Sequence, residues 1–314
     1  MGIGKRIEVT SEKTVSQKPS VDFIPQMPKY KIDDLIVPEH VKSKLLDAAE
    51  YAVNSQIVFE QWGLSKTHKQ SRKLGINFYG PPGTGKTMAA HAVAKFLGRK
   101  ILVVNYADIE SKYVGDTPKN ICAAFEAAKA SNSIIFFDEA DAILSRRVTN
   151  MNNATDVSVN QTRSVLLMLL NEYQDYVIFA TNFIENFDPA FMRRISMHIQ
   201  FELPDEDCRK RLWEKYIPNE MPLNIDCGEI AKKYDNLSGS DISNAVLNCA
   251  FKAARAKETI ISKSYIFEAV EDILASKAAN NKSENVTVSK RVVSEDYVKT
   301  KLSTDEIKMI EGEN

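Results

Sequence analysis

A glycine-rich loop at residues 80–87 constrains the possible folds of this chain more than any other feature. The loop reads Gly-Pro-Pro-Gly-Thr-Gly-Lys-Thr and lies between the apolar run 76–79 and the helical pattern 88–97. A strand, a glycine-rich turn and a helix in this order direct several backbone N–H groups and a helix N-terminus at one point. Glycine also lets the backbone approach a ligand closely, because no Cβ intervenes. The loop therefore predicts a binding site for a polyphosphate anion.

The end of the loop carries side chains that suit a nucleoside triphosphate such as ATP. The ammonium group of Lys86 can reach the outer phosphates, and the hydroxyl group of Thr87 can ligate Mg²⁺. A chance glycine-rich turn is the alternative, but the complete G-x-x-x-x-G-K-T string between a strand and a helix favours phosphate binding. The nucleotide-binding residues predicted from this loop are Pro82, Gly83, Thr84, Gly85, Lys86, Thr87 and Met88.

An acidic pair follows a second apolar run. Residues 134–137 are all apolar, as a central buried strand requires, and Asp138 and Glu139 come directly after them. Open parallel sheets bind ligands at this carboxyl edge. We predict that Asp138 holds Mg²⁺ together with Thr87, and that Glu139 activates the water that attacks the terminal phosphorus. An acidic helix start is the simpler alternative, since carboxylates favour helix N-termini. The neighbouring loop favours ATP hydrolysis.

The pattern of apolar residues divides the chain into four parts. Residues 1–30 are polar and punctuated by proline, which predicts a flexible or extended arm. Residues 31–203 alternate between helical and strand patterns and predict an α/β domain with a parallel five-stranded sheet flanked by helices. Residues 204–279 predict a small all-α domain, and residues 280–314 a charged tail. The expected strands are 76–79, 100–105, 133–137, 176–180 and 198–201. The expected helices are 88–97, 118–130, 158–173, 206–216, 224–234, 240–257 and 262–278, with 295–310 as a further candidate.

The bulk composition disfavours several classes of protein. The 314 residues are 44% hydrophobic and carry a net charge of −1, so the chain lacks the basic excess of a nucleic-acid binder. No apolar run approaches the roughly 18 residues that span a bilayer, and the first residues lack a signal-peptide core. The four cysteines are scattered, without metal-binding or disulfide spacing. We therefore expect a cytoplasmic protein without a membrane span.

These elements together resemble AAA+ ATPases of the group that contains katanin, spastin, the ESCRT-disassembling ATPase and the p97-type segregases. The resemblance covers residues 32–278 and includes the glycine-rich loop and the acidic pair. Asn182, at the end of the expected fourth strand, resembles the family's sensor 1, whose amide helps to orient the attacking water. The resemblance implies that Asn182 is catalytic and that residues 204–279 form a lid domain.

The resemblance extends to a pair of arginines. Residues 188–194 resemble the segment in which two arginines reach the nucleotide of the neighbouring subunit, which gives Arg193 and Arg194 a catalytic role. A guanidinium supplied across an interface accelerates hydrolysis by about 10³- to 10⁵-fold. The resemblance therefore implies a homo-hexamer whose activity needs assembly. A surface arginine pair on a helix is the alternative.

The resemblance also implies an adenine pocket. Residues 237–241 resemble the sensor 2 corner of this group, in which small residues contact the base and no arginine is present. The residues implied at this corner and around the base are Gly239, Ser240, Leu212, Tyr216, Ile36 and Val37. Periodicity alone would make Leu212 and Tyr216 ordinary core residues, so both interpretations stay open for them.

Two loops resemble the pore loops of the family. Lys112, Tyr113 and Val114 match the first pore loop, whose aromatic side chain grips an extended polypeptide inside the hexamer. The family usually has Glu-Ser-Glu after the following glycine, whereas residues 116–118 of this chain read Asp-Thr-Pro. Residues 148–158 match the second pore loop in position but not in composition.

The resemblance implies a hexameric, ATP-hydrolysing protein remodeller or unfoldase that threads a polypeptide through a central pore or disassembles a protein complex. Its cofactors would be ATP and Mg²⁺, and its partners a protein substrate and a dedicated adaptor or client. One alternative is a stand-alone ATPase of the Trip13 type that remodels a HORMA-type partner. Another is a nucleotide-dependent scaffold or nucleic-acid motor. A related membrane protease is excluded, because no H-E-x-x-H string occurs in the chain.

Overall fold

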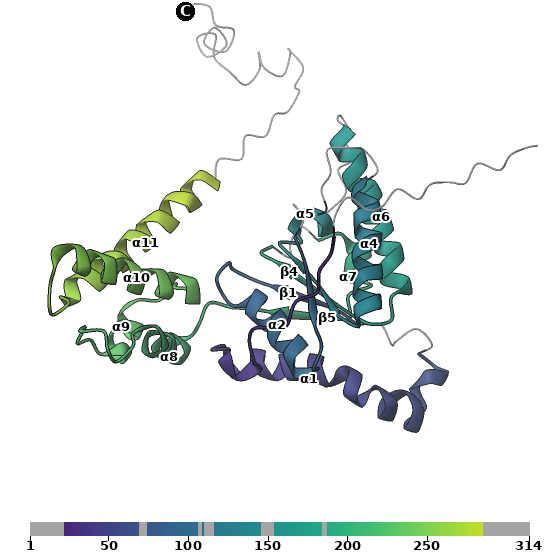
Figure 1. Cartoon of the computed structure of the whole chain (residues 1–314), viewed down its shortest axis with the longest axis horizontal. Helices are drawn as coiled ribbons and strands as arrows, with labels where there is room; N and C mark the ends of the chain where they lie inside the picture. The colour runs from purple at the N-terminus through teal and green to yellow at the C-terminus, as the bar shows by residue number, and fades with distance from the viewer. Residues whose placement is uncertain are drawn as a thin grey trace, which may run out of the picture.

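The computed structural model describes residues 22–68, 74–105, 109, 116–145, 154–183 and 187–284. Within these residues, a parallel sheet of five strands has the order β2-β3-β4-β1-β5. The sheet lies between helices, and the C-terminal helices lie to one side of it (Figure 1). The strands are β1 (Leu74–Tyr79), β2 (Ile101–Asn105), β3 (Ile134–Asp138), β4 (Tyr176–Thr181) and β5 (Met197–Gln200). The predicted fold class is confirmed, and the strand ends differ from the predicted ones by one or two residues.

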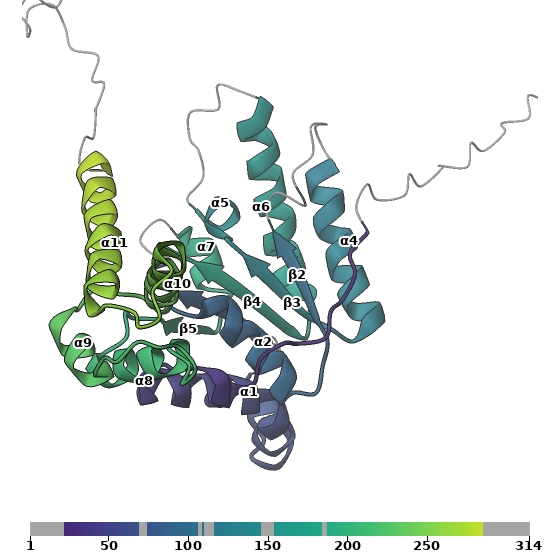
Figure 2. The ribbon, with the colours of Figure 1, turned by 60° about the vertical axis from the view of Figure 1, so that its left-hand side comes forward.

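Both faces of the sheet are covered by helices, which explains why its strands are nearly continuous apolar runs. Successive residues of a strand point to opposite faces. In β3, Ile134 and Phe136 therefore join one buried cluster, whereas Ile135 and Phe137 join another. Helices α1 (Glu39–Gln56) and α2 (Lys86–Phe96) pack on the first face. Helices α4 (Asp116–Ser131) and α6 (Ala154–Glu172) pack on the second (Figure 2).

Helix α1 was not predicted from the sequence. It begins after Pro38, and its buried residues Val41, Leu45 and Ala48 recur at helical spacing and pack in the first cluster. At its C-terminal end the helix continues into a π-helical turn, Ile57–Gln61. The sequence therefore contains a helical signal for α1, in the spacing of these apolar residues, that was not used.

Two short helices carry residues near the carboxyl edge of the sheet. Helix α5 (Asp141–Leu144) directly follows β3, and helix α7 (Pro189–Met192) lies between β4 and β5. Asp188 caps α7, because its side chain accepts a hydrogen bond from the N–H of Ala190 at 2.8 Å. Both helices are single turns, which periodicity cannot detect.

The helices after Pro204 form a bundle around a buried cluster of their own. Trp213, Ile242 and Val270 are fully buried in this cluster. The bundle comprises α8 (Glu206–Tyr216), α9 (Cys227–Lys233), α10 (Gly239–Ala256) and α11 (Lys263–Glu284). These helices agree with the predicted ones within a few residues, except that α11 continues six residues beyond the predicted end. Within the described residues, no helix combines the length and the apolar character needed to cross a bilayer.

The described part of the predicted arm is extended and contacts the sheet. Gln26 forms an antiparallel bridge with Ile101 of β2, with N–O distances of 2.8 and 2.9 Å. Phe23 packs against the second cluster, and Tyr30 contacts His91 of α2 edge to face. Residues 22–30 therefore lie along the edge strand and lead the chain to α1.

Candidate active site

The glycine-rich loop has a backbone that other residues would not adopt. Gly80 and Gly83 have φ angles of +139° and +75°, in the range that favours glycine. A Cβ at Gly80 would lie 1.9 Å from the carbonyl oxygen of Phe201, and one at Gly83 would lie 1.9 Å from Oγ of Ser240. The loop is therefore packed tightly between β5 and helix α10 and needs glycine at both positions.

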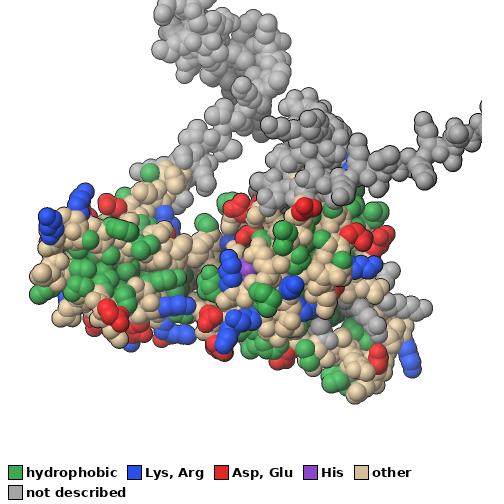
Figure 3. Space-filling view, viewed as in Figure 1, with side chains coloured by type: hydrophobic (Ala, Val, Ile, Leu, Met, Phe, Trp, Pro, Cys, Tyr) green, Lys and Arg blue, Asp and Glu red, His purple; other side chains and the backbone are tan. Residues whose placement is uncertain are grey.

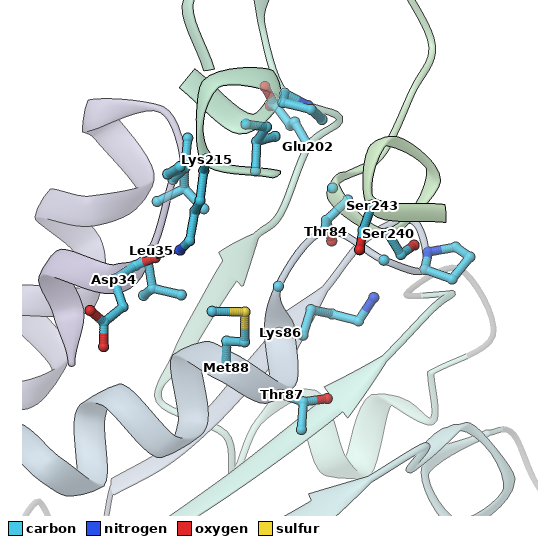
Figure 4. Close-up of a pocket in the computed structure, with 18 of the residues that line it drawn as sticks. Asp34, Leu35, Thr84, Lys86, Thr87, Met88, Glu202, Lys215, Ser240 and Ser243 are labelled. Carbon is cyan, nitrogen blue, oxygen red and sulfur yellow. Dashed lines mark hydrogen bonds between the residues drawn. The ribbon is translucent and has the colours of Figure 1, made fainter. Parts of the chain in front are cut away.

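The loop opens into a cavity of about 470 Å³ between the sheet and the C-terminal bundle. Figure 4 shows Lys86 and Thr87 at the start of α2, with Ser240 and Ser243 of α10 across the loop from them. The cavity is lined by every residue predicted to bind nucleotide: Ile36, Val37, Pro82, Gly83, Thr84, Gly85, Lys86, Thr87, Met88, Leu212, Tyr216, Gly239 and Ser240. Asp138, Glu139 and Asn182 line it as well. Its volume lies within the range of small-molecule and cofactor sites.

The ammonium group of Lys86 is buried against the loop. The residue is 8% exposed, and Nζ donates to the carbonyl oxygens of Gly80 at 2.7 Å and Pro81 at 2.9 Å. A third bond joins Nζ to Oδ1 of Asn182 at 3.0 Å. Burial lowers the pKa of Lys86 to about 8, although two nearby aspartates raise it. A polyphosphate would supply the negative charge that this desolvated cation favours, so the site fits such a ligand.

The residues predicted to hold Mg²⁺ lie next to each other. Oγ1 of Thr87 donates to Oδ2 of Asp138 at 2.9 Å, so the first turn of α2 meets the end of β3. Mg²⁺ prefers oxygen ligands and is commonly held by one or two protein groups together with phosphates. The hydroxyl and carboxylate oxygens at this position therefore fit a magnesium ion.

Glu139 has a strained backbone. Its φ angle is +50°, which places a non-glycine residue in the left-handed region. Oδ1 of Asp138 accepts its N–H at 3.0 Å, and the next N–H, of Ala140, donates to the carbonyl oxygen of Ala180 at 2.9 Å. Such a conformation costs on the order of 1–3 kcal/mol and persists where the surroundings hold it, often at functional sites. Glu139 is exposed and is one of the residues that line the cavity.

Arg193 and Arg194 are absent from the described residues that line the cavity. Arg194 is bound within its own subunit, because its guanidinium donates to Oδ1 of Asn171 at 3.0 Å and to the carbonyl oxygen of Ala190 at 2.8 Å. Arg193 is exposed at the end of α7. The structure therefore does not bring this pair to the cavity of its own chain.

The cavity also contains residues that the sequence analysis did not select. These are Asp34, Leu35, Pro38, Glu202, Pro204, Lys215, Ser243 and Asn244. Nζ of Lys215 donates to the carbonyl oxygen of Asp34 at 2.9 Å and thereby joins α8 to the segment before α1. Ser243 and Asn244 follow Ser240 by one helical turn, so helical spacing would have indicated them. For Lys215 the sequence contains no comparable signal.

The predicted pore-loop residues Lys112, Tyr113 and Val114 lie outside the described residues. Most of the predicted second pore loop, 148–153, lies outside them too, and residues 154–158 form the start of α6.

Residues 76–203 match the model of the family described as "ATPase family associated with various cellular activities (AAA)". Three similar curated proteins extend the comparison beyond this region. Cell division protein C of Sulfolobus acidocaldarius is 32% identical over 260 residues, 78% of this chain and 63% of the relative. The 26S proteasome regulatory subunit 6B homolog of Encephalitozoon cuniculi is 28% identical over 271 residues, 82% of this chain and 65% of the relative. That of Dictyostelium discoideum is 31% identical over 232 residues, 70% of this chain and 55% of the relative. The chain thus spans less than two thirds of the length of these relatives.

Proposed function

We propose that this chain, whose residues 76–203 match the AAA ATPase family, hydrolyses ATP to remodel other proteins and works as a homo-hexamer. The observation that carries the proposal is that only some of the predicted catalytic residues line the cavity. The cavity contains the loop, the acidic pair and Asn182, whereas Arg193 and Arg194 lie away from it. A site with this composition is complete when a second subunit supplies the arginines.

In the proposed mechanism, the residues of the cavity bind ATP and orient the attacking water. The N–H groups of the loop and the ammonium of Lys86 bind the phosphates. Thr87 and Asp138 would hold Mg²⁺, which would supply charge neutralisation for the phosphates. Glu139 accepts a proton from the water, and the amide of Asn182 orients it.

Surface features of the C-terminal bundle support assembly. Figure 3 shows many apolar side chains on the face of this bundle that is turned to the viewer. Leu247, Phe251 and Ile260 are 51, 74 and 74% exposed. Exposed apolar patches are typical of protein interaction sites. We propose that residues 204–279 act as a lid domain whose exposed face contacts the next subunit.

The Glu139→Gln variant tests assembly. It retains the size of the side chain but cannot take up a proton at physiological pH, so it should bind ATP without hydrolysing it. Mass photometry should then detect hexamers in the presence of ATP. The Lys86→Ala variant should bind no ATP and form no stable ring. Monomeric Glu139→Gln at saturating ATP would contradict the proposed hexamer.

The Tyr113→Ala variant tests protein remodelling, and its design rests on the sequence resemblance. The probe is green fluorescent protein fused to an unstructured tail, whose fluorescence is lost on unfolding. The wild type should unfold this probe with ATP, and Tyr113→Ala should hydrolyse ATP but leave the probe folded. Equal unfolding by both proteins would contradict threading past Tyr113. ATPase stimulation by single-stranded DNA in place of the probe would favour the nucleic-acid motor.

A further inference from the structure

One carboxylate beside the cavity has no role in the mechanism above. Asp141 is the first residue of α5, two residues after Glu139. Its oxygens accept the N–H of Asn182 at 3.1 Å each and the N–H of Phe183 at 3.2 Å. Asp141 is therefore bound to the backbone of the residue whose side chain was predicted to orient water.

The hydrogen bonds of Asp141 lie just beyond the end of the strand pairing. In the described residues, the pairing of β3 with β4 ends at Phe137 and Phe179, and that of β1 with β4 ends at Thr181. Asn182 thus lies beyond the ladders that fix its strand. The carboxylate of Asp141 continues the link between the two chain segments where the sheet has stopped. A carboxylate is a stronger acceptor than a neutral group, although at 3.1–3.2 Å these bonds are longer than the shortest charge-assisted ones.

The network continues from Asn182 to the phosphate site. Oδ1 of Asn182 accepts a hydrogen bond from Nζ of Lys86 at 3.0 Å. The turn of Glu139 is joined to the same strand, because the N–H of Ala140 donates to the carbonyl oxygen of Ala180 at 2.9 Å. Ala140 and Asp141, the two residues after Glu139, therefore both link the acidic turn to the end of β4.

We propose that Asp141 is a positioning residue for ATP hydrolysis: it fixes the backbone of Asn182 so that the Asn182 amide and the Glu139 carboxylate address the same water. The inference rests on the proposed role of Asn182. Asp141 does not touch the nucleotide in this scheme, so its loss should lower kcat and leave ATP binding intact. Displacing a catalytic group by about 1 Å can cost on the order of 100-fold in rate.

The variant Asp141→Asn tests this role. Asparagine has the same size as aspartate. The N–H of Asn182 donates to both carboxylate oxygens, so the NH₂ group of the new asparagine would face this N–H, which it cannot accept. We expect kcat to fall about 10- to 100-fold, with the KM for ATP changed by no more than about threefold. The control is Asp226→Asn, because Asp226 accepts the N–H groups of Gly228 at 2.7 Å and Glu229 at 3.4 Å in the C-terminal bundle, outside the cavity lining. This control should keep the wild-type kcat.

A double-mutant cycle shows whether Asp141 acts through Asn182. Asn182→Ala should lower kcat by itself, and adding Asp141→Asn should then change kcat by less than about twofold, because the two residues act as a unit. If the two losses multiply, or if Asp141→Asn alone keeps full kcat, the positioning role is wrong. If Asn182→Ala keeps full kcat, the proposed role of Asn182 is wrong instead.

A second substitution covers the case in which Asp141→Asn does not fold. Asp141→Glu retains the charge but moves the carboxylate by one methylene, so it should also lower kcat without weakening ATP binding. Thermal unfolding of each variant identifies those that are folded. Full kcat in a folded Asp141→Glu protein would overturn the proposal.

Discussion

The backbone N–H of Ser240 donates to the carbonyl oxygen of Gly83 at 3.3 Å, so the first turn of α10 touches the glycine-rich loop directly. The hydroxyl groups of Ser238 and Ser240 lie 3.1 Å apart, next to Gly83. A movement of the C-terminal bundle would therefore change the contacts of the loop that is proposed to bind phosphate. This contact gives nucleotide binding a direct path to the bundle.

The Gly83→Ala variant should weaken ATP binding by about tenfold or more. A non-glycine residue in the left-handed region costs about 1–2 kcal/mol. In addition, the new Cβ would lie 1.9 Å from Oγ of Ser240 and 2.6 Å from Oγ of Ser238, so these side chains or α10 itself must shift. Binding of a fluorescent ATP analogue measures the effect.

The matched control for this prediction is Gly98→Ala. Gly98 has a φ angle of +65°, similar to that of Gly83, but a Cβ there would meet no atom within 4 Å. Its replacement should lower the free energy of unfolding by about 1 kcal/mol and leave the affinity for ATP unchanged. Equal affinity for ATP in the two variants would show that the contact with α10 is not needed for binding.

The fold could be predicted from the sequence where the pattern of apolar residues fits only one kind of element. Apolar runs bounded by the loop and by the acidic pair indicated the strands of the sheet, because a parallel sheet buries both faces. Helix α1 was missed although its buried residues Val41, Leu45 and Ala48 have helical spacing. Helices α5 and α7 escaped because a single turn has no period.

In the candidate site, some residues could be predicted from the sequence and others could not. The loop and the acidic pair are local strings, so they could be found without knowledge of the fold. Lys215 and Asp141 act through contacts with Asp34 and Asn182, from which they are separated by 181 and 41 residues. No local string encodes such pairs. The roles of all these residues in binding and catalysis remain predictions.

The affinity for ATP should decrease as the pH rises above about 8. Burial lowers the pKa of Lys86 from its ordinary value of 10.5 to about 8, so the free protein loses this positive charge as the pH rises through 8. A bound polyphosphate favours the charged form and raises the pKa again. ATP binding should therefore take up about half a proton at pH 8 and almost none at pH 7.

Calorimetry in buffers of different ionisation enthalpy measures this proton uptake. The control is Lys95→Met, a change at an exposed lysine in the last turn of the same helix, which should leave the uptake unchanged. Without nucleotide, the unfolded state binds more protons at Lys86 than the folded state between pH 8 and 10.5, so this group makes the fold more stable as the pH rises. An affinity that stays constant from pH 7 to 9 would contradict the prediction.

Arg193 and Arg194 should differ in their effects on stability. Arg193 is exposed, so Arg193→Ala should leave thermal unfolding unchanged and lower kcat by about 10³-fold if it acts as an arginine finger. Arg194 donates to Asn171 and to the carbonyl oxygen of Ala190. Arg194→Ala should therefore also lower the free energy of unfolding by about 1 kcal/mol.

A mixing experiment tests whether Arg193 acts on the neighbouring subunit. Arg193→Ala chains retain Glu139, and Glu139→Gln chains retain Arg193, so a ring that contains both has some complete sites. The mixture should hydrolyse ATP faster than either variant alone. If no ratio of the two restores activity, Arg193 does not act across an interface.

Lys277 should stabilise the corner of α10 that touches the loop. Its Nζ donates to Oδ2 of Asp241 at 2.7 Å and to the carbonyl oxygen of Asn236 at 2.9 Å, while Asp241 forms a capping box with Ser238. Burial raises the pKa of Asp241, but the hydrogen bonds from Lys277 and Ser238 outweigh it and lower this pKa below its ordinary value. The stabilisation is therefore present at neutral pH and is lost as the pH falls into the acid range.

The Lys277→Met variant should lower the free energy of unfolding by about 1 kcal/mol at pH 7, a modest value because Lys277 is partly exposed. The difference from the wild type should shrink as Asp241 becomes protonated in acid. Urea titrations followed by the fluorescence of the buried Trp213, with Trp62 replaced by Phe in every protein, measure both effects in the bundle. Lys210→Met removes a more exposed pair with Glu214 at 3.9 Å and should change the unfolding free energy by less than about 0.5 kcal/mol. If the two variants are equally stable, the bond from Lys277 to Asp241 does not stabilise this corner.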